Sequence, residues 1–161
     1  MVSSGTATVE LPTDEQILIT REFDAPKHLV FKAYTTPELV KRWWAGKRGN
    51  VTIAEIDLRV GGRWRYVMIA DGGFEVAFHG EYREIVPGEK VVFTEVFELP
   101  DGSLSEATLN TATFDEAAGR TTLALLTEAS SREVRDMILA SGMEGGVQEG
   151  LDLLEELAIG L

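Results

Sequence analysis

The chain has 161 residues, the length of one domain that can bury a full hydrophobic core. It contains 27 acidic and 15 basic residues, which gives a net charge of −12, and it has no cysteine. A charge of this sign repels phosphate backbones, so nucleic acid is not an expected partner, and the missing thiols exclude a disulfide framework. The sequence has no apolar run that could span a membrane and no apolar signal core at its start. We therefore expect a cytoplasmic protein that has no membrane partner.

Residues 1–15 are rich in serine, threonine, glycine and acidic residues. This composition predicts a flexible leader, followed by a single domain over residues 16–161. The domain opens with Gln16 to Phe23, where apolar and polar residues alternate as in a half-buried strand. Pro26 and Pro37 then indicate the starts of two short helices, because proline is favoured in the first turn of a helix.

Short turns rich in glycine and proline divide the next part of the chain into strands. Connections this short join antiparallel neighbours. Together with the first strand they predict a seven-stranded antiparallel sheet, whose other strands are Val51 to Val60, Arg63 to Ala70, Phe74 to Val86, Lys90 to Leu99, Leu104 to Phe114 and Thr121 to Thr127. The predicted fold class is therefore α+β.

Two of these strands indicate which face of the sheet is covered. Aromatic and charged residues alternate over residues 63–66 and again over residues 78–82. Successive side chains of a strand point to opposite faces, so we expect one exposed and one buried face. The exposed side chains would be Arg63, Glu75, His79 and Glu81, and the buried ones Trp64, Tyr66, Phe78 and Tyr82.

The last segment, Ser130 to Ala158, has apolar residues at helical spacing and predicts a long helix that covers the buried face. It also contains Gly142, Gly145, Gly146 and Gly150, and each glycine costs roughly 0.8–1 kcal/mol relative to alanine in a helix interior. Two interpretations remain open. Either the glycines provide a close approach or a ligand volume between the helix and the sheet near Gly146, or the helix breaks near Gly142 to Gly146.

Several short motifs follow one another in a specific order: Ala25-Pro26, Val30-Phe31, Trp43-Trp44, Gly61-Gly62-Arg63, Gly80-Glu81-Tyr82 and, in the last helix, Gly142-Met143-Glu144-Gly145-Gly146. Their order and spacing resemble the activator of heat-shock protein 90 ATPase homologue-like family, a branch of the START or SRPBCC superfamily. The resemblance extends from about Ile17 to Leu157, nearly the whole chain.

The resemblance implies the helix-grip fold, in which a curved antiparallel sheet wraps around a C-terminal helix and leaves a cavity between them. It does not imply one function, because superfamily members bind lipids, sterols or plant hormones, cyclise polyketides or act as co-chaperones. Members of this family often carry a tryptophan after the glycine of the closing helix, where this chain has Gly146. That difference would remove a large ring from the interface between helix and sheet.

Side chains that face the closing helix could line a pocket for a flat or aliphatic ligand, since ligand pockets are mostly apolar with a few placed polar groups. An ordinary packed core is the alternative. Glu95 or Arg65 near the rim, with the hydroxyls of Tyr66 and Tyr82, could orient a polar end of the ligand. The predicted ligand-binding residues are Trp64, Tyr66, Met68, Phe78, Tyr82, Asn110, Met137, Gly146, Val147 and Leu151.

The sequence predicts no catalytic residue, metal site or cofactor. His28 and His79 are the only histidines, and neither lies near a serine nucleophile motif. His79 and Glu81 share the exposed face of a strand, where polar side chains are common, and this favours a solvated pair over metal ligands.

Three functions therefore compete. The leading hypothesis is non-catalytic binding of a small hydrophobic molecule. The second is a co-chaperone-like interaction with a protein partner through the basic segment Lys41 to Arg65, which holds seven basic and two acidic residues. The third is a cyclase-like or hydrolytic enzyme, which a buried Glu95 or an inward-facing His79 would support.

Overall fold

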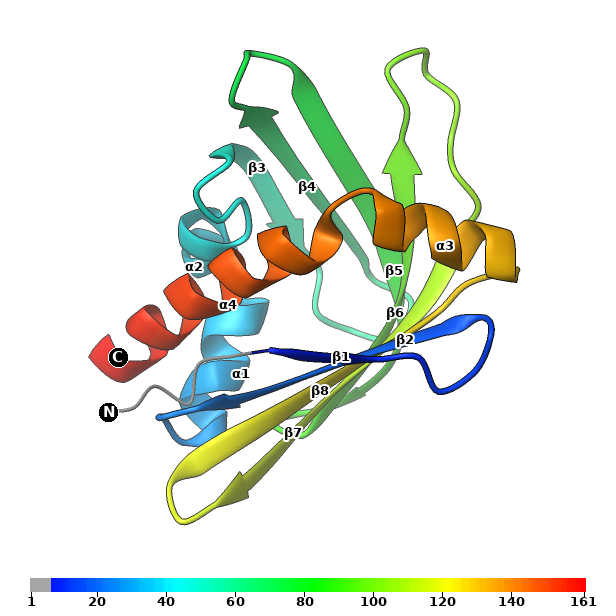
Figure 1. Cartoon of the computed structure of the whole chain (residues 1–161). Helices are drawn as coiled ribbons and strands as arrows, with labels where there is room; N and C mark the ends of the chain where they lie inside the picture. Colours follow the sequence, from blue (N-terminus) through cyan, green and yellow to red (C-terminus); the bar gives the residue numbers. More distant parts are fainter. Residues whose placement is uncertain (1–6) are drawn as a thin grey trace.

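The computed structural model describes residues 7–161, in which one curved antiparallel sheet wraps around the C-terminal helices (Figure 1). The spatial order of its eight strands is β1-β2-β8-β7-β6-β5-β4-β3. The strands are β1 (Thr8–Glu10), β2 (Gln16–Phe23), β3 (Gly49–Ile56), β4 (Arg63–Ala70), β5 (Glu75–Val86), β6 (Lys90–Glu98), β7 (Thr108–Ala117) and β8 (Arg120–Glu128). The predicted α+β class and helix-grip architecture are confirmed.

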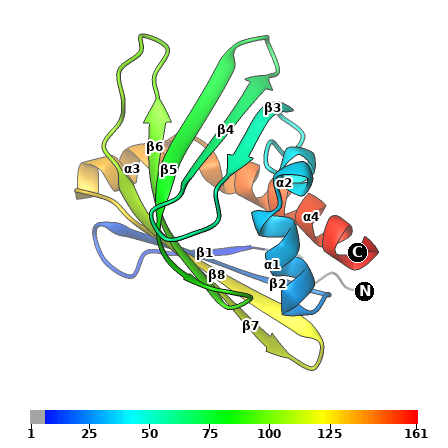
Figure 2. The same ribbon diagram turned by 180° about the vertical axis from the view of Figure 1, so that it is seen from behind.

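Residues 7–161 also form four helices. The helices α1 (Lys27–Thr35) and α2 (Pro37–Trp43) follow β2, as predicted, and α3 (Arg132–Ala140) and α4 (Met143–Gly160) end the chain. Seen from behind, α1 and α2 lie together beside β3 and α4 (Figure 2). The hydroxyl of Ser131 caps α3 by accepting a hydrogen bond from the Val134 amide at 3.1 Å.

The sheet has one strand more than predicted. The additional strand β1 lies inside the predicted leader, where Val9 pairs with Ile19 of β2. The start of β1 is also held by α4, because the Ala7 amide donates a hydrogen bond to Oε1 of Gln148 at 2.7 Å. The rest of the predicted leader, residues 1–6, lies outside the described residues.

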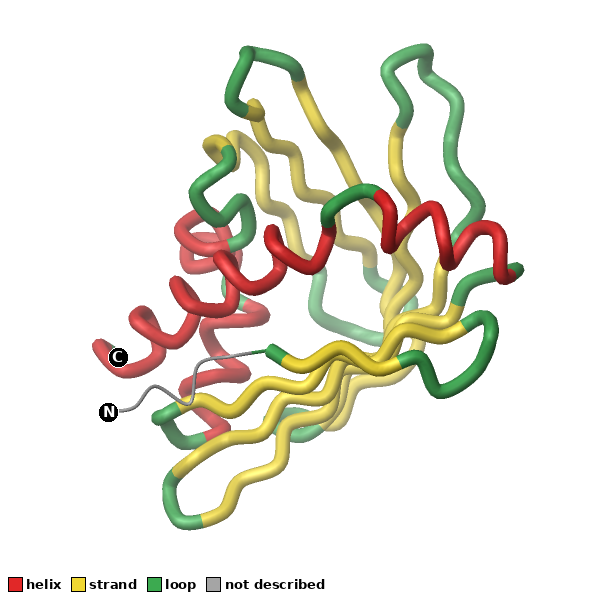
Figure 3. The backbone as a smooth tube through the Cα atoms, viewed as in Figure 1, coloured by secondary structure: helices red, strands yellow, loops and turns green. Residues whose placement is uncertain are grey.

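The predicted single closing helix is two helices, so the alternative of a break is the correct one. Gly142 separates α3 from α4 with a φ of 81°, a left-handed conformation that favours glycine over other residues. The change of direction is visible in the backbone trace (Figure 3).

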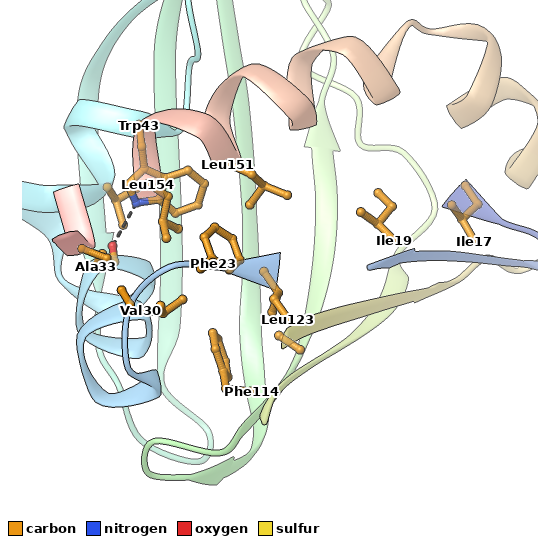
Figure 4. Close-up of a cluster of buried hydrophobic side chains, with 14 residues drawn as sticks. Ile17, Ile19, Phe23, Val30, Ala33, Trp43, Phe114, Leu123, Leu151 and Leu154 are labelled. Carbon is orange, nitrogen blue, oxygen red and sulfur yellow. Dashed lines mark hydrogen bonds between the residues drawn. The ribbon is translucent and has the colours of Figure 1, made fainter. Parts of the chain in front are cut away.

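The main hydrophobic core lies at one end of the concave face, between β2, β7 and β8 on one side and α1 and α4 on the other (Figure 4). Phe23, Phe114, Leu123 and Leu154 are almost completely buried there. Trp43 closes this core from α2, and its Nε1 donates a hydrogen bond to the Ala33 carbonyl at 2.9 Å.

Two contacts fix the position of α4 over this core. A Cβ built on Gly150 would lie 3.1 Å from the Trp43 carbonyl oxygen, so the backbones of α4 and α2 approach closely at this glycine. On the other side, Nη2 of the buried Arg21 pairs with Glu155 at 2.9 Å and with Asp152 at 3.1 Å. The helix is therefore held against both α2 and β2.

The other glycines of α4 do not face the sheet. A Cβ on Gly145 would lie 2.6 Å from Nη2 of Arg48, and one on Gly146 would lie 3.9 Å from the same guanidinium. Arg48 belongs to the loop before β3, where it also pairs with Glu149 at 3.3 Å. The expectation that Gly146 opens space between helix and sheet is wrong, because this part of α4 lies against that loop.

The two glycines predict opposite effects of added side chains. Gly146→Ala should stabilise the protein by up to about 1 kcal/mol, because the new methyl has ordinary contact distances and alanine is the better helix former. Gly150→Val should destabilise it by roughly 1–3 kcal/mol, because the added groups meet a backbone oxygen that cannot easily move. Urea denaturation measures both free energies of unfolding, and a stable Gly150→Val variant would contradict the close packing of α4 on α2.

Candidate functional site

The pairing of three neighbouring strands brings aromatic side chains together on the concave face. Tyr66 of β4 pairs with Phe78 of β5, and Phe78 pairs with Phe97 of β6. One step along the sheet, Tyr82 pairs with Phe93. The rings are in contact, with centroid distances of 5.1 Å for Phe78 and Phe97 and 6.5 Å for Tyr82 and Phe93. These residues form an aromatic wall.

Trp64 lies in this wall because its neighbour on β5 is a glycine. A Cβ on Gly80 would lie 2.6 Å from the indole nitrogen, so any larger residue would displace the ring. The indole Nε1 instead donates a hydrogen bond to the Thr94 carbonyl of β6 at 3.1 Å. Trp64 is only 4% exposed, and its polar group has a partner.

Two further aromatic residues come from the helical segment, and one of them contacts the wall. Trp44, which follows α2, contacts the rings of Tyr66 at 5.4 Å and Phe78 at 5.6 Å. Tyr34 of α1 stacks on Trp43 with a centroid distance of 5.6 Å. Trp43 therefore anchors α2 in the core, whereas Trp44 covers part of the aromatic wall.

The predicted exposure of β4 and β5 is confirmed in part. Trp64 and Tyr82 are buried and Arg63 and Glu75 are exposed, as predicted, whereas Tyr66, Phe78, His79 and Glu81 all have intermediate exposure. His79 and Arg65 lie on the outer face, where both bind the Glu98 carboxylate at 2.9 Å. Arg65 is therefore not at the rim of the concave face, and His79 is not turned inward.

The aromatic wall is not fully covered. Tyr66, Phe78, Phe93 and Phe97 all keep part of their surface accessible. In α4, the fully buried residues begin only at Gly150, and the preceding residues 143–149 include none. The half of the concave face formed by β4, β5 and β6 is thus covered less completely than the half that holds the main core.

Glu95 is the one acidic side chain of this surface with a strongly raised pKa. It lies on β6 two residues from both Phe93 and Phe97, and it pairs with Thr108 of β7. Burial alone raises the pKa of Glu95 to about 7, and no cation opposes that shift. Within residues 7–161 its carboxylate has no hydrogen bond or ion pair.

The oxygens of Glu95 nevertheless touch accessible space. In residues 7–161, fully enclosed side-chain nitrogen or oxygen atoms without a partner occur only in Arg21 and Arg120. Because the Glu95 oxygens have no partner and are not among these atoms, they must border space that a small probe can reach. A deep carboxylate beside accessible space is a group that can receive a ligand.

The charge of this carboxylate affects two nearby tyrosines, Tyr34 and Tyr66, and a third tyrosine, Tyr82, belongs to the same wall. Burial chiefly raises the pKa of Tyr34 and of Tyr66, and the nearby charge of Glu95 contributes to both shifts. Burial also raises the pKa of Tyr82, with a second contribution from Asp57. The phenols therefore stay protonated at neutral pH and present neutral hydrogen-bond donors.

Asn110 borders the wall opposite Phe93, but its amide already has partners. Its Nδ2 donates to the Thr108 hydroxyl at 3.0 Å, and its Oδ1 accepts from the Thr127 hydroxyl at 2.7 Å. With 4% exposure, Asn110 ties β7 to β8 at the base of the site.

The remaining predicted site residues separate into three groups. Met68 is partly buried on the same parity as Tyr66, and Val147 packs at the border of the main core. Leu151 belongs to that core, with 3% exposure. Met137 was placed in the pocket wrongly, because α3 presents it outward with 71% exposure, and Gly146 faces Arg48.

Sequence reasoning missed the residues at the centre of the site. Glu95 was expected near the rim, and Tyr34, Phe93 and Phe97 were not included. A signal for them exists, since Phe93, Glu95 and Phe97 occupy alternate positions of one strand and so share a face. A carboxylate within an aromatic row of that kind is unusual enough to mark a site.

Other features offer weaker sites. One hollow of about 210 Å³ is lined by Arg42, Leu153, Glu156 and Leu157, and another, of about 550 Å³, by Thr13, Asp14, Glu15, Ser131, Arg132 and Glu133. Neither has an aromatic lining. The described residues contain no cluster of three potential metal ligands among histidine and acidic side chains, and none of their helices is long and apolar enough to cross a membrane.

Comparison with known families agrees with this architecture. The family model described as Activator of Hsp90 ATPase homolog 1-like protein matches residues 24–158. The chain belongs to this family. A search of curated proteins found no match.

Solved structures of similar proteins share the fold of this family member. Protein Ms6760 from Mycobacterium smegmatis is 25% identical and superposes with a TM-score of 0.84, covering 94% of this chain and 96% of its own. A Rhodobacter sphaeroides protein is 22% identical with a TM-score of 0.87, covering 97% and 99%. The AHSA1-like protein from Aeromonas hydrophila is 21% identical with a TM-score of 0.65, covering 89% and 92%.

The unpaired carboxyl predicts a pH-dependent effect of Glu95→Gln in this AHSA1-like protein. Because the pKa of Glu95 is higher in the folded protein than its usual 4.5, native Glu95 holds its proton more tightly and wild-type stability decreases as pH rises from about 4.5 to about 7. Glutamine avoids this loss. The variant should gain roughly 1–3 kcal/mol over wild type at about pH 8 and much less at about pH 5.

Denaturant unfolding at the two pH values measures this difference. The exposed residue Glu106 supplies the control, since Glu106→Gln removes the same charge without changing a buried group. An equal effect of Glu95→Gln at both pH values would show that Glu95 is not buried in the folded protein.

Proposed function

We propose that this protein binds a small hydrophobic molecule against the aromatic wall of its concave face, without catalysing a reaction on it. The observation that carries the proposal is the incomplete burial of the wall around Glu95, an unpaired carboxylate that borders accessible space. Apolar walls with a few convergent polar groups are typical of small-molecule sites. The protonated hydroxyls of Tyr34 and Tyr66 would add donors beside the carboxylate.

Membership of the AHSA1-like family also suggests a protein-interaction role, but the basic segment offers less charge than its sequence suggests. Three of its cations are paired, Arg48 with Glu149, Arg59 with Asp57 and Arg65 with Glu98. Surface pairs of this kind reduce the local positive potential that an acidic partner would need. We therefore rank co-chaperone-like binding through residues 41–65 below ligand binding.

An enzymatic role has one specific observation in its favour. A carboxyl group with a pKa near 7 is suited to general acid–base catalysis at neutral pH. A catalytic site of this kind usually adds a nucleophile or a second titrating partner, and the neighbours of Glu95 are neutral phenols. The proposal of binding therefore ranks ahead of a cyclase-like or hydrolytic reaction.

A matched pair of tryptophan substitutions tests the proposal. Phe78→Trp enlarges a partly buried ring of the wall and should weaken the binding of the neutral fluorescent probe N-phenyl-1-naphthylamine by about tenfold or more, by filling the space it would occupy. Phe74→Trp makes the same change on a hairpin tip that is 62% exposed and should leave binding unchanged.

Probe fluorescence titrations measure both affinities, with melting temperatures to show that the variants fold. Should Phe78→Trp unfold the protein, Phe93→Trp provides a second substitution in the wall. No probe binding by the wild type, or equal loss in Phe74→Trp and the wall variant, would contradict a ligand site at the aromatic wall.

A further inference from the structure

The charges around Glu95 also limit which polar group a ligand can carry at this site. In residues 7–161, no lysine, arginine or histidine forms an ion pair with this carboxylate, and burial is the only resolved cause of its raised pKa. Arg21, a buried cation of β2, is held by Asp152 and Glu155. The site therefore contains a potential negative charge and no positive charge to balance it.

The aromatic side chains of the wall also favour a positively charged ligand group. Tyr34, Tyr66 and Tyr82 carry hydroxyls, none of which forms a hydrogen bond with Glu95 in the described residues. Their rings, with Trp64 and Phe93, present aromatic faces, and aromatic faces attract cations. Both the carboxylate and the rings thus favour a positively charged group.

We propose that the ligand is a hydrophobic amine, whose protonated nitrogen pairs with the Glu95 carboxylate while its apolar part lies on the aromatic wall. This inference rests on the ligand-binding function proposed above. A buried carboxylate becomes favourable when a cation neutralises it, whereas an anionic ligand would place two like charges in a poorly solvated site. A neutral alcohol would gain a hydrogen bond at most.

Three competitors that share an eight-carbon chain distinguish a cationic, a neutral and an anionic ligand group. Octylamine, octanol and octanoate would each displace N-phenyl-1-naphthylamine at about pH 8, where the amine is protonated and the Glu95 carboxyl is mostly ionised. We expect octylamine to displace the probe at about tenfold lower concentration than octanol, and octanoate to be the weakest.

Two variants distinguish the site from general surface attraction by the acidic protein. Glu95→Gln should abolish the advantage of octylamine over octanol while octanol itself changes little. The control Glu106→Gln removes an exposed charge and should preserve the advantage. The ratio of the two competitors within each variant is the quantity compared, so a general change in probe affinity does not affect the result.

The outcomes distinguish failure of the amine inference from failure of the proposed ligand-binding function. If octanol and octylamine compete equally, or if Glu95→Gln leaves their ratio unchanged, the amine inference is wrong and the binding function stands. If octanoate is the strongest competitor, a carboxylate-bearing ligand replaces the amine. If the probe does not bind the wild-type protein, the proposed function itself is wrong.

Discussion

The close approach of α4 to α2 at Gly150 decides how the concave face is divided. A glycine at position 150 lets the helix lie close against the Trp43 carbonyl, where a Cβ would make a tight contact of 3.1 Å, and the Arg21 pairs with Asp152 and Glu155 hold the same helix from the side of β2. The apolar residues Leu151 and Leu154 are thereby placed over β2, β7 and β8. The core is concentrated there, and the aromatic wall of β4, β5 and β6 receives less cover.

Polar groups on the two halves differ in how far they are enclosed. Near the core, Nε and Nη1 of the buried Arg21 are enclosed without a partner in the described part of the chain, but other polar groups near the core are paired. The Thr121 hydroxyl donates to the Ala25 carbonyl at 2.7 Å, and Asn110 is bonded on both sides of its amide. In the wall, Trp64 has a partner, whereas within residues 7–161 the Glu95 carboxylate has none and borders accessible space. A partly covered carboxyl of this kind is open to a partner from outside the chain, as the proposed ligand site requires.

The sequence predicted the parts of the fold that depend on local pattern. The alternation of side chains over residues 63–82 correctly separated the buried Trp64 and Tyr82 from the exposed Arg63. The order of short motifs predicted the family that the family model shows. Features that depend on the packing of one element against another could not be predicted from the sequence. The left-handed Gly142 turns α4 relative to α3, so helical spacing carried across the break placed Met137 on the wrong side. Gly146 was misplaced because nothing in the sequence shows that the Arg48 loop lies against it.

Two glutamates on β6 show why the depth of a residue could not be inferred from its neighbours in sequence. Glu98 lies on the outer face, where hydrogen bonds from Arg65 and then His79 lower its pKa to about 2. Glu95 lies three residues away on the concave face, where burial raises its pKa to about 7. The odd separation alone predicts opposite faces, but the lowered pKa of Glu98 depends on partners from β4 and β5, and the raised pKa of Glu95 depends on its burial. Glu98 is already paired with Arg65 on the outer face, whereas within residues 7–161 Glu95 has no ion pair. That difference is why the proposed ligand site is built around Glu95 and not around Glu98.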